Sequence, residues 1–169
     1  FVDGGPGQMK ISPDNKLLSY VVSGGDFYGF YVFNFNNSTG LITEKFADTT
    51  ANENQYGTAF SPDSKVLYKC AGNKIYQYDV STTTNVDFIA SKTIFTSTTS
   101  GLLSMQLAPD GKIYIARPIS NSLGVINNPN VLGIGFDYEA EQQSLGGRLS
   151  LAGLPNQLNS LIPHNNIFI

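Results

Sequence analysis

A short phrase, written three times at a nearly constant interval, is the feature of this chain that most restricts its fold. The three copies read ISPDNKLLSY at 11–20, FSPDSKVLY at 60–68 and LAPDGKIYI at 107–115. Their aspartates, Asp14, Asp63 and Asp110, stand 49 and 47 residues apart. A period of about 50 strand-forming residues is typical of β-propellers, in which each repeat is one four-stranded blade.

The phrase has the chemistry of a tight turn between two antiparallel strands. Proline presets the φ angle of the second turn position, and aspartate can accept a hydrogen bond from the backbone two residues later. We therefore expect Asp14, Asp63 and Asp110 to be structural turn residues. A third strand in each repeat is expected to end at Phe35, Tyr78 and Ile126, each followed by Asn or Asp.

The predicted fold is an all-β propeller with three to four four-stranded antiparallel blades in this chain. The predicted boundaries are 1–7 for the end of a preceding blade, 8–50, 56–100 and 101–135 for blades, and 136–169 for a closing segment and tail. Tyr138 to Leu145 is short and acidic, and we interpret it as loop. Propellers have about 4–8 blades, so three cannot close a ring. We expect this segment to be the C-terminal part of a propeller of about six to eight blades, with the remaining blades upstream in the same natural chain as its partners.

Composition excludes several classes of function. Charged residues make up 14% of the chain, the formal net charge is −3, and no stretch gathers Lys or Arg. Nucleic-acid binding needs a basic surface, so none is expected. No apolar run approaches the roughly 20 residues of a membrane span, so no membrane insertion is expected. Cys70, the only cysteine, lies in a predicted strand and is interpreted as a buried apolar residue.

Several longer strings resemble one family of secreted propeller domains from large surface proteins of Bacteroidetes bacteria. These strings are QLAPDGKIYIAR, VINNPN, SLGGR and GLPN, in that order. The resemblance implies a secreted or cell-surface location, PKD-type modules after the propeller and a sorting domain for type IX secretion. The chain departs from it at 134–137, where many relatives carry a cysteine, and at LPNQLNS, where an aromatic usually follows the Asn.

Candidate catalytic and metal-binding groups are few. His164 is the only histidine and is interpreted as a solvated or capping residue in the tail; no catalytic residue and no cofactor is predicted. Asp137, Glu139 and Glu141 could bind Ca²⁺ through carboxylate oxygens, but an acidic loop is the preferred interpretation. Asn side chains stabilise irregular loops through local hydrogen bonds. Asn127, Asn128 and Asn130 are therefore expected to be structural.

Aromatic side chains supply the remaining binding hypothesis. Alternation along GFYVFNF, at 29–35, would place Phe30 on one face of a strand and Tyr31 and Phe33 on the other. Most of this bulk is expected to pack between blades. Phe27 and Tyr28 belong to an inserted loop and could stack on sugar rings or anchor a protein.

Three functions remain open. The first is a non-catalytic secreted or cell-surface propeller for protein or glycan binding, adhesion or display. The second is an enzyme, because SPDSKVLY and NNSTGLI also resemble repeats of six-phosphogluconolactonase-like propellers. The third is a structural spacer in a surface filament. A converged Arg, His and Glu cluster at the channel would favour the enzyme.

Overall fold

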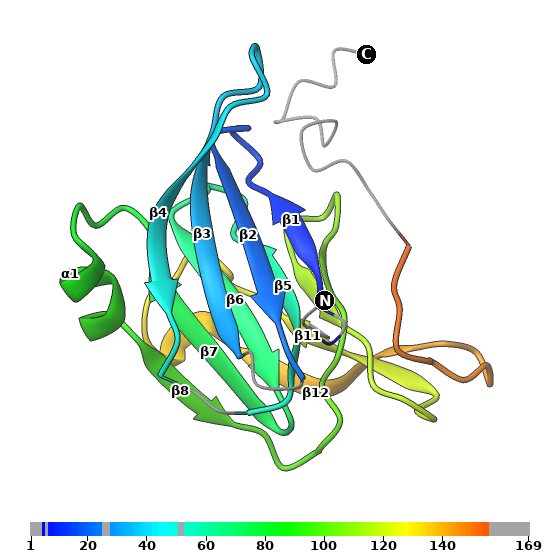
Figure 1. Cartoon of the computed structure of the whole chain (residues 1–169). Helices are drawn as coiled ribbons and strands as arrows, with labels where there is room; N and C mark the ends of the chain where they lie inside the picture. The colour runs from blue at the N-terminus through cyan, green and yellow to red at the C-terminus, as the bar shows by residue number, and fades with distance from the viewer. Residues whose placement is uncertain (1–4, 6, 25–27, 51–52, 156–169) are drawn as a thin grey trace.

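The computed structural model describes residues 5, 7–24, 28–50 and 53–155, and these form three four-stranded antiparallel sheets (Figure 1). The first sheet contains β1 (Met9–Ile11), β2 (Leu17–Val22), β3 (Gly29–Phe35) and β4 (Ile42–Asp48). The second contains β5 (Gln55–Phe60), β6 (Val66–Ala71), β7 (Lys74–Asp79) and β8 (Thr93–Thr96). The third contains β9 (Met105–Leu107), β10 (Ile113–Ile115), β11 (Ser122–Ile126) and β12 (Tyr138–Ser144). The prediction of an all-β chain of four-stranded antiparallel units is confirmed.

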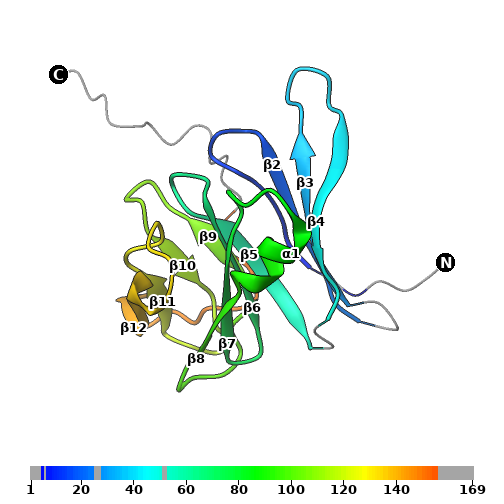
Figure 2. The same cartoon turned by 90° about the vertical axis from the view of Figure 1, so that its left-hand side faces the viewer.

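The three sheets spread like a fan from their first strands (Figure 2). Strands β1 and β5 are in contact, as are β5 and β9, whereas β4, β8 and β12 form the outer edges. Gln8 joins all three sheets at the inner edge. Its side-chain amide donates to Ser104 Oγ at 2.6 Å and its carbonyl accepts from the backbone amides of Thr58 and Met105. One side chain therefore fixes the spacing of the inner strands.

The thrice-written phrase forms the same turn in each sheet. Asp14 Oδ1 accepts from the amide of Lys16 at 3.2 Å, and Asp63 and Asp110 accept in the same way from Lys65 and Lys112, both at 3.1 Å. The residue after each aspartate has a positive φ angle. These residues are Asn15 at 59°, Ser64 at 62° and Gly111 at 80°. A left-handed residue here lets the chain reverse into an antiparallel hairpin.

An aromatic core joins the first and second sheets, and a helix that the sequence analysis did not predict completes it. Thr84 is the N-cap of helix α1 (Asn85–Ala90), and its hydroxyl accepts a hydrogen bond from the backbone amide of Asp87. Its Phe88 is fully buried and stacks on Phe46 and Tyr78, each with a ring-centroid distance of 4.7 Å. The helix has only six residues, so it stabilises the fold through this one side chain.

Two ionisable side chains are buried between these sheets. Lys69 donates to Gln55 Oε1 at 2.9 Å, and its ammonium lies 4.7 Å from the ring centre of Tyr76. Burial lowers the pKa of Lys69 to about 8. Asp48, 1% exposed, accepts from Tyr78 Oη and Lys92 Nζ at 2.8 and 2.9 Å. The first two sheets are therefore joined by polar as well as apolar contacts.

A second core joins the second and third sheets. Phe136 packs edge-to-face on Tyr68 and Phe95, with ring-centroid distances of 5.8 and 5.6 Å. Gly57 on β5 lies close to the backbone of Leu103, in the segment directly before β9. Cys70 is buried here, as its place in the sequence suggested, and burial raises the pKa of its thiol to about 12. A thiol that stays protonated near neutral pH is not a nucleophile.

The interpretation of Tyr138 to Leu145 as loop is wrong. Tyr138–Ser144 forms β12, which pairs with β11 as the outer strand of the third sheet and follows the short 3₁₀ helix η1 (Ile134–Phe136). The third four-stranded unit therefore extends beyond residue 135. This strand escaped detection because it is largely exposed, so its sequence needs no alternation of apolar and polar residues.

Candidate functional site

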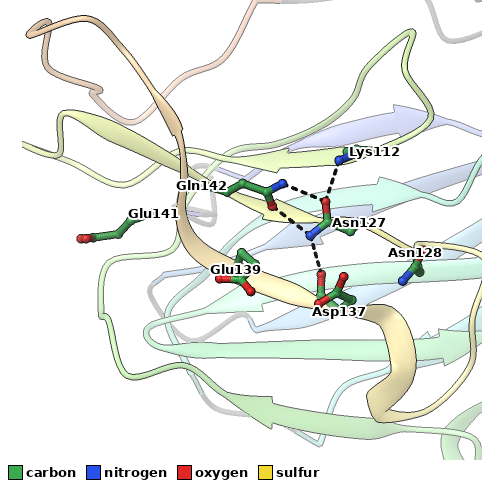
Figure 3. A pocket seen from close by; sticks show the side chains of 7 residues that line it. All are labelled: Lys112, Asn127, Asn128, Asp137, Glu139, Glu141 and Gln142. Carbon is green, nitrogen blue, oxygen red and sulfur yellow. Dashed lines mark hydrogen bonds between the residues drawn. The ribbon is translucent and has the colours of Figure 1, made fainter.

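Two grooves border the third sheet, and the first contains five of the residues predicted from the sequence (Figure 3). This groove, termed the acidic groove, has a volume of about 620 Å³. It is lined by Lys112, Asn127, Asn128, Asp137, Glu139, Glu141 and Gln142. Lys112 follows the turn before β10, and Asn127 follows β11. Asp137 directly precedes β12, whereas Glu139 and Glu141 lie on it.

Asn127 is the centre of the hydrogen bonds in the acidic groove. Its side-chain Oδ1 accepts from Lys112 Nζ at 2.7 Å, and its side-chain Nδ2 donates to Gln142 Oε1 at 2.9 Å (Figure 3). The backbone amide of Asn127 donates to the carbonyl of Asp137 at 2.9 Å. These contacts hold β12 against β11, so Asn127 has the geometry of a structural residue.

The two neighbouring asparagines also make contacts within the fold. The backbone amide of Asn128 donates to the carbonyl of Phe136 at 3.0 Å. Asn130 Oδ1 accepts from the backbone amide of Asp63 at 3.2 Å. The loop after β11 therefore touches the turn of the second sheet, and a repeated turn in one sheet is held by a side chain from the next.

The structure does not bring Asp137, Glu139 and Glu141 together as a calcium site would require. Among the described residues, no three His, Cys, Asp or Glu side chains lie close enough to hold a metal ion. Figure 3 shows Glu141 pointing away from Asn127. Its carboxylate accepts instead from Arg117 at 2.9 Å.

Arg117 belongs to the second groove, termed the loop groove, with a volume of about 400 Å³. It is lined by Ser100, Arg117, Pro118, Ile119, Ser120, Asn121, Glu141 and Leu149. Three separate segments meet here: the connection from β8 to β9, the connection from β10 to β11, and the chain after β12. Loops held by a rigid sheet are where binding residues are commonly found.

Arg117 is the buried cation of the loop groove. The residue is 6% exposed, and its Nη2 donates to Ser120 Oγ at 2.7 Å as well as to Glu141. In the part of the chain that the structure describes, its Nε has no hydrogen-bond partner. The guanidinium therefore retains hydrogen-bonding capacity that the protein itself does not use.

The rim of the loop groove carries two exposed apolar side chains, and the backbone of one of them is strained. Ile119 has a φ angle of 59°, which is unfavourable for a β-branched residue, and it is 78% exposed. Leu149 is 60% exposed. An isolated β-bridge between Ser120 and Ser150 joins the segment that contains Ile119 to the segment that contains Leu149. Strain of this kind is often found at functional sites.

The remaining sequence candidates have different outcomes. Tyr28 is half-buried immediately before β3, while Phe27 and His164 lie outside the described residues. The hypothesis that Phe27 and Tyr28 bind a ligand stays a prediction. Neither Arg117 nor Ile119 was predicted from the sequence, and the available signal was an arginine two residues after the strand β10. No helix among the described residues has the length and apolar character of a membrane span.

Comparison with known proteins identifies the fold alone. No family model and no curated protein matches the sequence. A protein from Lactobacillus plantarum matches with a TM-score of 0.55 and 20% identity, over 83% of this chain and 41% of that one. A candidate 6-phosphogluconolactonase from Bacteroides fragilis matches with a TM-score of 0.52 and 18% identity, over 80% and 42%. The WD40 repeats of RRP9 match with a TM-score of 0.50 and 14% identity, over 72% and 33%.

These neighbours are propeller-like, so the three sheets of this chain are β-propeller blades. The chain spans about two fifths of the length of the first of these structures. The resemblance to lactonase-like propellers is therefore confirmed at the level of the fold.

Proposed function

We propose that this chain is a non-catalytic binding module built on a β-propeller scaffold, with the loop groove as its binding site. The observation that carries the proposal is the composition of that groove. It combines a buried guanidinium with exposed apolar side chains, Ile119 and Leu149, on loops held by a rigid sheet. Rigid apolar contacts together with a few placed polar groups are typical of recognition sites.

The proposed setting is the surface of a Bacteroidetes bacterium, where the chain would serve adhesion or display. The strings QLAPDGKIYIAR, VINNPN, SLGGR and GLPN support this proposal, as does the low content of charged residues. PKD-type modules and a type IX sorting domain in the same natural protein are part of the proposal. The partner would be a surface protein or a glycan.

Glycan and matrix-protein arrays test the binding function. We expect at least one class of ligand to be retained by the wild-type chain and lost by Leu149→Asp, which places a charge on the apolar rim of the loop groove. Leu41→Asp is the matched control, because Leu41 is 62% exposed directly before β4, in the connection between two strands of the first sheet. If the chain binds no ligand on any array, the third function, a structural spacer in a surface filament, is favoured.

A lactonase-like enzyme is the second candidate, favoured by the structural likeness to two candidate 6-phosphogluconolactonases. The polar side chains that meet at the inner strands include Gln8, Lys10, Ser104 and Gln106, with Lys10 Nζ donating to Gln106 at 2.6 Å. Arg117 and Glu141 pair instead at the outer strand β12. Hydrolysis of 6-phosphogluconolactone above the spontaneous rate would contradict the non-catalytic proposal.

Further blades are proposed to cover the outward face of the first sheet. On β3 the alternation is as predicted, with Phe30 buried toward the second sheet and Tyr31 and Phe33 partly exposed on the other face. The apolar side chains on this other face include Met9, Ile11, Leu18, Tyr20, Val22, Tyr31, Phe33, Phe35 and Ile42. Three blades are fewer than any closed propeller needs. A neighbouring four-stranded blade is the occupant that repeats the contact between the first and second sheets.

Dye binding and sedimentation test this face. We expect the isolated chain to bind a fluorescent hydrophobic dye, and Phe33→Glu to remove most of the signal because it places a charge in the apolar face. Val86→Glu is the matched control, since Val86 is 76% exposed on α1. Absence of dye binding would contradict the proposal. A stable dimer that Phe33→Glu dissociates would instead identify a second copy as the occupant.

A further inference from the structure

We infer that the loop groove binds a carboxylate carried on a short apolar group, and that this carboxylate replaces Glu141 on Arg117. The inference rests on the proposed binding function and specifies its ligand. The structure contains the required contact in internal form, because a carboxylate of the protein already accepts from Arg117 Nη2 at 2.9 Å. The position of Arg117 Nη2 is therefore already suited to binding the carboxylate of a ligand.

Arg117 and Glu141 differ greatly in how firmly they are held. The side chain of Arg117 is 8% exposed, whereas that of Glu141 is 68% exposed on an outer strand. An exposed carboxylate gains little from an ion pair and loses side-chain freedom when it forms one. Glu141 can therefore swing into solvent, while the guanidinium stays in place. Arg117 then presents its Nη2 group, which Glu141 has left, to the incoming carboxylate as a charge-assisted donor.

The apolar part of the ligand is assigned to the rim. Ile119 and Leu149 are exposed beside the guanidinium, and two backbone hydrogen bonds hold them there. The backbone amide of Ile119 donates to the carbonyl of Ser150 at 2.9 Å, and the backbone amide of Ser150 donates to the carbonyl of Ser120 at 2.7 Å. Because both walls are tied together, a ligand would bury apolar surface without first ordering a loop.

The surrounding charge favours a monoanion over phosphate. Glu141 lines both grooves; Glu139 on the same strand and Asp137 directly before that strand lie in the acidic groove. These carboxylates would repel a doubly charged phosphate more strongly than a singly charged carboxylate. A carboxyl group on an aliphatic or aromatic side chain, or at the end of a peptide, has the required chemistry.

Titrations of the ¹⁵N-labelled chain with acetate, hexanoate and inorganic phosphate, followed by NMR, test the inference. We expect both carboxylates to shift amide signals of the loop groove, with hexanoate on the order of ten-fold tighter than acetate, because its added methylenes contact the rim. Leu149→Ala is expected to reduce that advantage while leaving acetate affinity unchanged. Tighter binding of phosphate than of hexanoate would overturn the assigned ligand class.

Variants of the ion pair separate the inference from a structural role for Arg117. Glu141→Gln removes the internal competitor and is expected to tighten acetate and hexanoate about two- to five-fold, the scale of an exposed ion pair. Glu139→Gln, on the same strand outside the loop groove, is the control and is expected to change neither affinity. Arg117→Gln is expected to abolish binding.

If Arg117→Gln fails to fold, the affinities of Glu141→Gln still test the inference, because this variant keeps the guanidinium in place. Unchanged affinities in Glu141→Gln, or no shift of groove signals with either carboxylate, would overturn the inference. Array binding that survives such a failure would leave the proposed binding function standing. The two proposals therefore fail separately.

Discussion

Replacing Asp48 with alanine is expected to lower the free energy of unfolding by about 3–5 kcal/mol, the cost of breaking a buried ion pair by removing one partner. Asp48 is 1% exposed and lies at the end of β4. Its carboxylate accepts from Lys92 and Tyr78, and also from the hydroxyl of Thr50 at 2.6 Å. The substitution would leave the ammonium and the phenol without their acceptor at the junction of two sheets.

The same carboxylate predicts how stability depends on pH. Burial by itself raises the pKa of Asp48, but hydrogen bonds from Thr50, Lys92 and Tyr78 outweigh it and hold the pKa well below its ordinary value. The pKa is thus lower in the folded than in the unfolded chain. The stabilisation is complete above the unfolded value of about 3.9, and is lost as pH falls below it toward the folded value.

Urea denaturation at pH 7 and at acidic pH checks both statements. Glu44→Ala is the matched control, because Glu44 is an exposed residue on the same strand. Asp48→Asn should make the acid dependence shallower than in the wild type. A loss at pH 7 no greater for Asp48→Ala than for Glu44→Ala would show that the buried network does not stabilise the fold.

Replacing Gly57 with alanine is expected to cost about 3 kcal/mol, at the upper end of the range for overpacking a core. A Cβ atom at this position would lie 2.0 Å from the carbonyl oxygen of Leu103 and 2.9 Å from Cys70 Sγ. The nearer atom belongs to the backbone and cannot rotate away. The second and third sheets would have to separate at their inner edge.

Gly153→Ala is the matched control, because nothing lies within 4 Å of a Cβ atom added there. Thermal unfolding of both variants measures the difference. We expect a lower midpoint for Gly57→Ala and an unchanged midpoint for Gly153→Ala. Equal midpoints would mean that the contact between β5 and the segment before β9 is looser than the structure shows.

Local chemistry explains which elements could be predicted. The three hairpins follow from the turn phrase, since proline, aspartate and a residue that tolerates positive φ specify a reversal without help from distant residues. Helix α1 carries a similar local signal, a Thr at its cap with an Asp three residues later, but six residues are too few to show helical periodicity. Strand β12 carries no such signal, because an exposed outer strand has no buried face to encode.

The candidate site was harder to predict because its residues depend on contacts between remote segments. The sequence places Asp137, Glu139 and Glu141 at alternate positions, which suggests a shared face, yet Glu141 turns to Arg117, 24 residues earlier. Ile119 gains its role from a bridge to a segment about 30 residues later in the chain. No pattern of neighbouring residues in the sequence predicts either contact.

By itself the sequence determined the repeating unit, its turns and the all-β character of the chain, because these depend on backbone preferences within a few residues. Only the tertiary structure decided which residues far apart in the chain come into contact. Asp48 with Lys92 and Tyr78, Gly57 with Leu103, and Arg117 with Glu141 are all separated by 24 residues or more. Such contacts form only after the strands, sheets and loops have packed, when burial removes the water that would otherwise satisfy the polar groups.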